Sequence, residues 1–145
     1  MTSFEHILIA YDDSQPALRA FEMATDLALR LHSRVTLVTV LEPLPSYVQM
    51  AAMVDPTMPE TLREAKRARL QDLQTAACDR AKEKGLKLET ILLESSEISG
   101  LLEAIRQASP DLLVIGRQAH SSSLEIAGTV RGVVNESPCP VLAVA

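Results

Sequence analysis

The chain has 145 residues, 47% of them hydrophobic, and a formal net charge of -5. A chain of this size buries roughly two-thirds of its unfolded surface as one compact unit, so we expect a single domain spanning residues 1–145. The acidic balance offers no broad basic surface to a phosphate backbone, which argues against nucleic acid as a partner. The amino terminus lacks the pattern of a signal peptide, and no apolar run reaches the ~18 residues of a membrane span. We therefore expect a cytoplasmic protein without membrane contact.

The spacing of cysteines and histidines argues against redox and metal chemistry. Cys78 and Cys139 lack the CxxC spacing of a redox pair or a zinc ribbon, and we interpret them as reduced, buried thiols. His6, His32 and His120 fall on different predicted elements without ligand spacing. No metal site is expected.

The first forty residues predict two strands around one helix. Residues 6–11 form a short apolar run, typical of a parallel strand covered on both faces. Residues 12–14 supply turn and helix-cap chemistry, and residues 35–41 are β-branched and apolar, which favours a second strand. Between them, apolar residues recur at helical spacing at Ala17, Phe21, Ala24, Ala28 and Leu31.

Residues 42–59 contain four prolines, which predicts a long loop. This loop carries more apolar side chains than a solvated linker needs. It therefore forms a lid or partner-contact flap, or else it packs on its own domain. The apolar side chains are Tyr47, Val48, Met50, Met53, Val54 and Met58.

A long helix is predicted over residues 61–84, with Gly85 placed to end it. Its apolar face carries Leu70, Leu73, Ala77 and Ala81. A cluster of basic residues interspersed with acids is predicted to be its solvated side. The cluster consists of Arg63, Lys66, Arg67 and Arg69.

The remaining residues continue the alternation of strands and helices. Strands are predicted at residues 86–93, 111–116 and 141–144, with helices at 97–108 and near 130–134. Strict alternation predicts the α/β class, with a five-stranded parallel doubly wound sheet in a three-layer α/β/α arrangement. Ligands of such sheets bind beyond the carboxyl ends of the strands. We therefore expect the site at residues 12–14, at residues 40–43 and from residue 116 onward.

Phosphate-binding motifs of the common kinds are missing from the sequence. Neither GxxxxGK[ST] nor GxGxxG occurs, so P-loop hydrolysis and ordinary dinucleotide binding lack their backbone cradle. Small residues do follow the fourth strand from Gly116, and Gly128 and Thr129 are predicted to open the last helix. A helix amino terminus favours phosphate, but a plain surface loop would contain the same residues.

Five short segments occur in a fixed order: ILIAYDDS at 7–14, VLEP at 40–43, DLLVIG at 111–116, GTV at 128–130 and CPVLAV at 139–144. Their order and spacing resemble those of the universal stress protein family across essentially the whole chain. The resemblance implies a Rossmann-like fold of the adenine nucleotide alpha hydrolase-like type and a role in stress response. It also implies a homodimer paired through the last strand, here Val141, Leu142, Ala143 and Val144.

The same resemblance implies a set of nucleotide-binding residues. They are Ala10, Tyr11, Asp12, Val40, Gly116, Arg117, Ala119, Gly128, Thr129 and Val130. A carboxylate at Asp12 suits ribose hydroxyls, although a helix cap would use the same residue. The loop from Gly116 departs from the family pattern, because Ala119 replaces a glycine and the loop is one residue shorter. Asp13 likewise stands where the family usually has glycine.

We expect a dimeric regulatory or signalling module that binds ATP or another adenine nucleotide, alone or with Mg²⁺. The alternative is a module of the same fold that binds no nucleotide and acts through protein partners, using residues 47–58 and 141–144. An enzyme is not expected, because the serines after His120 lack a GxSxG motif. Slow ATP hydrolysis has no evident general base. Tyr47 is either a base-stacking or a packing residue.

Overall fold

Five strands form one sheet at the centre of this computed structural model, which describes residues 4–117 and 123–145. The strand order is β3-β2-β1-β4-β5, and every neighbouring pair runs parallel. This confirms the predicted five-stranded parallel sheet. The strands are β1 (His6–Ala10), β2 (Arg34–Leu41), β3 (Leu88–Glu94), β4 (Leu112–Gly116) and β5 (Val141–Val144).

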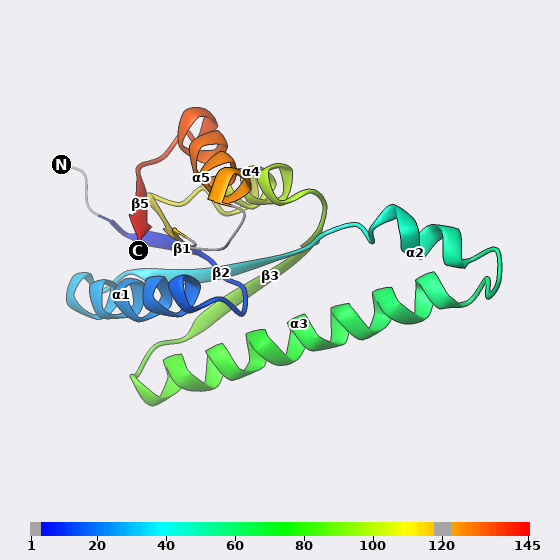
Figure 1. Ribbon diagram of the computed structural model, residues 1–145. Coiled ribbons are helices and arrows are strands. Elements are labelled where there is room, and N and C mark those ends of the chain that lie inside the picture. The colour runs from blue at the N-terminus through cyan, green and yellow to red at the C-terminus, as the bar shows by residue number, and fades with distance from the viewer. Residues whose placement is uncertain (1–3, 118–122) are drawn as a thin grey trace.

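Helices cover both faces of the sheet, which confirms the predicted three layers (Figure 1). On one face α1 (Gln15–Leu31) and the carboxyl-terminal part of α3 (Met58–Glu83) pack on the strands. On the other face lie α4 (Glu97–Ala108) and α5 (Ser123–Glu136). Each face therefore has its own apolar core.

The direction of winding reverses between β1 and β4. From β1 the chain adds β2 and then β3 on one side, and it returns to add β4 and β5 on the other side. All residues of the central strands β1 and β4 are buried. Their continuous apolar runs follow from this burial on both faces. The reversal places the carboxyl ends of β1 and β4 at a crevice where ligands of doubly wound sheets bind.

Helix α1 begins and ends at residues with recognisable capping chemistry. The Ser14 hydroxyl accepts a hydrogen bond from the Ala17 amide at 3.2 Å, which satisfies one free donor of the first turn. His32 adopts a left-handed conformation with φ 57° and ends the helix. The predicted apolar stripe is buried except for Leu31, which is 45% exposed. Leu31 is the last residue of the helix, so its side chain lies at the margin of the core.

The prediction of a continuous loop over residues 42–59 is wrong. The segment contains the short helix α2 (Ser46–Ala51), and α3 begins within it at Met58. Pro45 is the cap residue of α2, and Pro59 lies in the first turn of α3. Proline is tolerated at these positions because the first turn of a helix has no intrahelical partner for its amide. The prolines therefore mark helix starts here.

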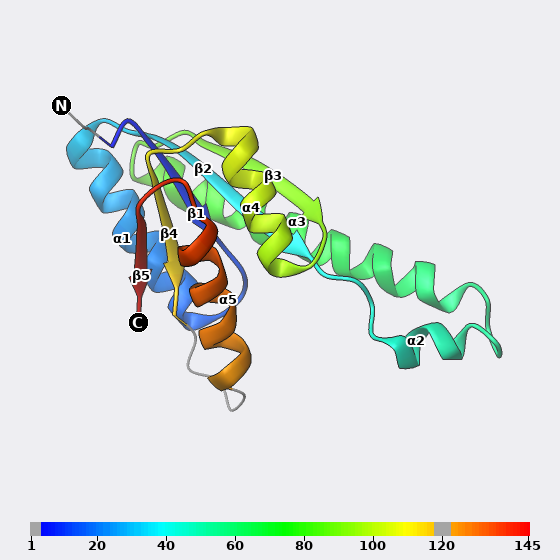
Figure 2. The same ribbon diagram turned by 90° about the horizontal axis from the view of Figure 1, so that it is seen from above.

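Helix α2 and the first residues of α3 project beyond the sheet, and we call residues 46–62 the arm (Figures 1 and 2). Val48 is its one predicted apolar residue that is buried. Met53 and Val54 are 89% and 92% exposed. The alternative in which this segment packs on its own domain is therefore wrong for most of its side chains.

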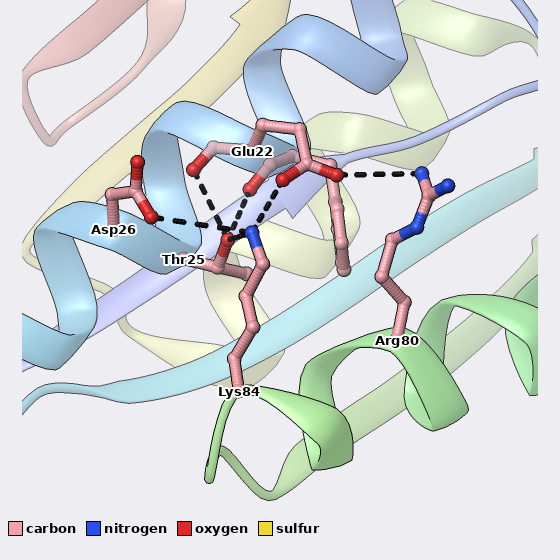
Figure 3. Close-up of polar contacts among 6 residues, drawn as sticks. Glu22, Thr25, Asp26, Arg80 and Lys84 are labelled. Carbon is pink, nitrogen blue, oxygen red and sulfur yellow. Dashed lines mark hydrogen bonds and ion pairs between the residues drawn. The ribbon is translucent and has the colours of Figure 1, made fainter.

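The carboxyl-terminal part of α3 is fixed to α1 by a polar cluster (Figure 3). Glu22 of α1 pairs with Arg80 at 3.3 Å and also with Lys84. The Lys84 ammonium donates to the Thr25 hydroxyl at 3.1 Å and lies 4.0 Å from Asp26. Because Ala77 and Ala81 are buried beside this cluster, α3 is anchored at the end opposite the arm.

Cys78 and Cys139 are both free thiols of intermediate burial, so the expectation of buried side chains is wrong. Burial is still sufficient to raise the pKa of the Cys78 thiol, and the charge of Asp79 adds to the effect. In the described parts of the chain, no helix has the length and apolar character needed to cross a membrane.

Candidate functional site

A cavity of about 220 Å³ opens at the carboxyl edge of the sheet. The ends of β1, β2 and β4 contribute to its wall, together with the starts of α1 and α4 and one turn of α5. The crevice therefore lies where the doubly wound topology predicts it. Its wall consists of Ala10, Tyr11, Asp12, Ser14, Ala17, Val38, Val40, Glu42, Glu97, Leu101, Ile115, Gly116, Thr129 and Val130.

Most of the residues predicted to bind nucleotide lie on this wall. They are Ala10, Tyr11, Asp12, Val40, Gly116, Thr129 and Val130. Arg117 is exposed beyond β4 and is not part of the wall; its amide donates to the Val144 carbonyl at 2.5 Å. Ala119 lies outside the described residues. The role of all these residues in binding a nucleotide stays a prediction.

The expectation that Gly128 and Thr129 open the last helix is wrong. Helix α5 begins at Ser123, so both residues lie within it. Residues 123–127 contain neither proline nor glycine, and nothing in their sequence prevents an earlier start. The dipole at the start of α5 is therefore not located at Gly128, and Thr129 faces the cavity from a helical turn.

Asp12 faces the cavity and shapes the loop after β1. Its Oδ1 accepts a hydrogen bond from the Ser14 amide at 2.8 Å. The side chain that caps α1 belongs to Ser14, so the capping interpretation of Asp12 is wrong. The neighbouring Asp13 lies off the cavity wall and pairs with Arg69 of α3. The second acidic charge of the loop is therefore balanced by an arginine outside the cavity.

The basic cluster of α3 is only partly the solvated face that its sequence predicts. Arg63 and Arg67 both pair with Glu94 at the end of β3. Arg69 pairs with Asp13, as described above, and lines with Lys66 an adjoining groove of about 460 Å³. These contacts bring the helix across the carboxyl edge of the sheet, next to the cavity.

Glu97 and Glu42 are cavity residues that the family resemblance did not imply. Glu97 opens α4 and Glu42 follows β2 directly, and both residues line the cavity. Burial raises the pKa of the Glu97 carboxyl to about 7, and the carboxyls of Glu42 and Asp12 add to the rise. Near neutral pH, Glu97 therefore exchanges between the protonated and the ionised form.

The position of Glu97 could not be read from the sequence. An acid in the first turn of a helix is ordinary, because the helix dipole favours it there. Only the strand order, with β2 beside β1, brings the start of α4 over the loops that follow these two strands. Glu42 did fall within the predicted region 40–43, where no role was assigned to it.

Two further wall residues fix the shape of the crevice. The Tyr11 ring packs on Phe21 with centroids 5.4 Å apart, and burial raises the pKa of its phenol, so that it stays neutral. Gly116 allows β4 to approach α1, because an added Cβ would lie 2.5 Å from the Pro16 carbonyl carbon. Tyr47 is 71% exposed and is not on the wall, so it neither packs in the core nor faces this cavity.

No group of three or more histidine, cysteine, aspartate or glutamate side chains suited to a metal ion occurs within residues 4–117 and 123–145. Asp12, Glu42 and Glu97 are three carboxyl residues on the wall of one cavity. A carboxylate is a hydrogen-bond acceptor and a carboxylic acid is also a donor. The cavity thus offers both kinds of group on a wall that combines apolar side chains with the hydroxyl residues Tyr11, Ser14 and Thr129.

Comparison with known proteins identifies the family. A sequence model described as the universal stress protein family matches residues 3–145. The chain belongs to the universal stress protein family. A universal stress protein of Thermus aquaticus is 29% identical over 143 residues, which cover 97% of this chain and 98% of that relative.

Solved structures of the family have the same fold. Universal stress protein UspA from Lactobacillus plantarum superposes with a TM-score of 0.84 over 100% of both chains, at 22% identity. A universal stress protein solved in complex with cAMP has a TM-score of 0.73 and 20% identity over 99% of this chain and 98% of its own. One from Archaeoglobus fulgidus, solved in complex with dAMP, has a TM-score of 0.63 and 16% identity over 100% of both.

Proposed function

We propose that this universal stress protein is a cytoplasmic regulatory module, a single domain over residues 1–145, that binds an adenine nucleotide in the cavity at the carboxyl edge of its sheet. The observation that carries the proposal is the convergence of three strand ends on one crevice lined by Asp12, Val40 and Gly116. Relatives of the same fold were solved with cAMP and with dAMP. Both ligands contain adenine and a phosphate.

The wall provides chemistry for each part of such a ligand. Val38, Val40 and Leu101 give an apolar surface for a base. Asp12 offers a carboxylate to ribose hydroxyls. Gly116 and Thr129 lie on the β4 side, where a backbone without Cβ and a hydroxyl suit phosphate oxygens. ATP with Mg²⁺ and smaller adenine nucleotides share the base and ribose contacts.

Isothermal titration with ATP and Mg²⁺, AMP and cAMP tests the proposal. We expect Asp12→Asn to weaken binding by about ten- to a hundredfold, because a hydrogen bond to a charged group contributes about 1.5–3 kcal/mol. Asparagine keeps the oxygen that accepts the Ser14 amide, so the loop is preserved. Asp13→Asn is the matched control, because Asp13 lies off the wall. Absence of heat with every adenine nucleotide at millimolar concentration rejects the proposal.

The proposal includes a homodimer formed through β5. This strand is at the end of the sheet, so one of its edges pairs with no other strand in the described part of the chain. Ala143 is exposed on it, and unpaired strand edges favour association with a second strand. Light scattering at micromolar concentration is expected to give twice the 15.8 kDa of one chain. A mass of one chain would remove the dimer from the proposal and leave nucleotide binding intact.

A second candidate function is a protein-interaction module that binds no nucleotide. The observation in its favour is the arm, where Tyr47 and Met50 are 71% and 69% exposed in addition to Met53 and Val54. Exposed apolar patches mark interaction sites in folded proteins. Under this candidate, Met53→Asp with Val54→Asp abolishes partner binding, and Asp12→Asn changes nothing.

A further inference from the structure

A second hollow lies next to the cavity, between the arm and the end of β2. Its volume is about 590 Å³. Its wall residues come from residues 41–44, from α2 and the residue after it, from the first turns of α3, and from Glu94 and Ser95 at the end of β3. We call this hollow the arm groove. All of its wall residues belong to the part of the chain that the structure describes.

The arm groove is held in place by contacts of the sheet and of α3. Leu41, the last residue of β2, is 4% exposed and lies opposite Glu94 in the register of β2 and β3. The Ser95 amide donates a hydrogen bond to the Leu41 carbonyl oxygen at 3.1 Å, and the Glu94 carboxylate pairs with Arg63 of α3. Both views show α2 beside the start of α3 (Figures 1 and 2). The groove is therefore part of the fold and not a gap between loose segments.

The uncharged surface of the arm groove is mainly apolar. An apolar surface with polar residues at its rim marks an interaction site on a folded protein, and an occupant that removes it from water gains free energy in proportion to the area covered. The apolar wall residues are Leu41, Pro43, Leu44, Ala52 and Pro59.

The charged wall residues of the arm groove are mostly acidic. Glu42, Glu60 and Glu94 contribute three carboxyls to the wall, and Arg63 contributes one guanidinium. Arg63 lies 3.5 Å from Glu60 and also pairs with Glu94. Glu94 has a second partner in Arg67, whereas Glu60 shares Arg63 and Glu42 adds a further negative charge. The groove therefore favours a cationic occupant and disfavours phosphate groups.

The arm next to the groove exposes flexible apolar side chains. Met50, Met53 and Met58 are 69%, 89% and 39% exposed. Methionine is unbranched and polarisable, and it is common on surfaces that bind apolar partners of varied shape. An occupant small enough to lie in the groove alone would leave these side chains in water. An occupant that covers both the groove and the arm is a polypeptide segment.

We propose that the arm groove is a docking site for a segment of a protein partner that combines apolar and basic side chains, as an amphipathic helix does. Its apolar side chains contact Leu44, Ala52 and the methionines of the arm. Its lysine or arginine side chains lie next to Glu42 and Glu60. This inference rests on the partner-binding role of the arm in the second candidate function. It names the site and the chemistry of the partner, and it holds whether or not the cavity binds a nucleotide.

A synthetic peptide serves as the probe. It is an amphipathic helix of about 18 residues with leucine on one face and lysine on the other, and its counterpart carries glutamate in place of every lysine. Titration calorimetry is expected to show binding of the lysine peptide and no heat with the glutamate peptide. Amide NMR spectra of the labelled protein locate the site. We expect the shifts caused by the lysine peptide at residues 41–44, 46–63 and 94–95.

Ala52→Arg is the decisive variant, because it places both bulk and positive charge on the wall of the groove. Ala52 follows α2 with helical backbone angles, so an arginine is accommodated there without backbone strain. We expect the variant to bind the lysine peptide at least about tenfold more weakly, since like charges at an interface repel. Ala65→Arg is the matched control, because Ala65 is exposed on α3 and lies off the groove wall. It is expected to bind as the unaltered protein does.

A second pair of variants separates docking from attraction by net charge. Glu42→Gln with Glu60→Gln is expected to weaken binding of the lysine peptide about three- to tenfold, because each exposed ion pair contributes only a modest free energy. Glu83→Gln with Glu136→Gln removes the same charge from exposed positions off the groove wall. This control is expected to leave the affinity nearly unchanged.

The failures are distinguishable. If the two peptides bind equally, if Ala52→Arg binds as Ala65→Arg does, or if both pairs of glutamate variants lose affinity equally, the inference is overturned. Shifts confined to residues 53–58 also overturn it, but they leave the second candidate function standing. If the lysine peptide produces neither heat nor shifts, the inference is overturned, and titration with adenine nucleotides still decides the nucleotide function separately.

Discussion

The cavity and the arm lie at the same edge of the sheet, but the cavity partly buries a carboxyl group, whereas the arm exposes large apolar side chains. In the cavity, Glu97 is partly buried beside Glu42 and Asp12. On the arm, Met53 and Val54 are almost fully exposed. Burial of carboxyls costs free energy, and exposure of large apolar groups forgoes a stabilising contribution. Neither arrangement is explained by folding stability.

The difference teaches that the two regions depend on the core to different degrees. The cavity is formed by the ends of the buried strands β1, β2 and β4, so its carboxyls are held by the most stable part of the fold. The arm is attached to the sheet through the rest of α3 and contributes few buried side chains. Perturbed groups on a rigid frame indicate a binding site. An exposed segment with few contacts indicates local mobility.

The largest expected effect sharpens this contrast and comes from truncating two large apolar side chains, one in the core against the wall residue Tyr11 and one on the arm. Phe21 is completely buried between α1 and the sheet, and Phe21→Ala is expected to lower the free energy of unfolding by about 3–5 kcal/mol. Met53→Ala is expected to change it by less than about 0.5 kcal/mol. Urea unfolding followed by circular dichroism measures both. A large loss for Met53→Ala would show that the arm packs against the protein in solution.

A smaller effect is expected at the boundary between the cavity and the core. A Cβ at position 116 would meet the backbone of Pro16 and Ala17 at 2.5 and 2.6 Å. Because backbone cannot move aside as a side chain does, Gly116→Ala is expected to cost about 1–3 kcal/mol and to weaken nucleotide binding. Thermal unfolding and titration with cAMP measure the two results.

Gly132→Ala is the control for that substitution. Its Cβ would meet only the end of the Ile98 side chain, at 2.9 Å from Cδ1, and the residue lies inside α5. Alanine favours a helix interior by up to about 1 kcal/mol over glycine, which offsets the adjustment of Ile98. Equal losses at positions 116 and 132 would contradict the claim that the approach of β4 to α1 needs a glycine.

The sequence was sufficient for the sheet and for most of the cavity wall. Continuous apolar runs identified β1 and β4, and alternation of strands and helices required parallel crossovers. The region after each of these strands could then be predicted as ligand-facing, which located Asp12 and Gly116 on the wall. These features depend on local pattern and on general rules of topology.

Features that depend on contacts between distant segments were not predicted. Pro45 and Pro59 suggested a loop, because a proline that starts a helix and one that prevents a helix look alike in sequence. The start of α5 at Ser123 was not predicted, because the serines before it were interpreted as loop residues. The pairing of Arg69 with Asp13 and the meeting of Glu97 with Glu42 required the strand order and the path of α3. Tertiary structure alone creates such neighbours.

The smallest expected effect concerns the free-energy cost of placing the Glu97 carboxyl in the cavity. The pKa of Glu97 is raised from 4.5 to about 7 in the folded protein, so the folded state holds this proton more tightly than the unfolded chain. The resulting stabilisation is complete below pH 4.5 and is lost as the pH rises through 7. Because Glu97 is partly exposed, solvent screening reduces the effect to about 1 kcal/mol.

Glu97→Gln removes this titration, so the variant does not lose this stabilisation as the pH rises. The free energy of unfolding of the variant, relative to that of the unaltered protein, is therefore expected to be about 1 kcal/mol higher at pH 8 than at pH 4.5. Urea titrations at the two pH values measure the difference. Glu103→Gln should show no such gain, because that carboxyl is paired with Arg106. If Glu97→Gln gains nothing at pH 8, the carboxyl is solvated and uncoupled from Glu42. The Glu97 carboxyl would then be as solvated as the side chains of the arm, and the contrast between the two regions would fail.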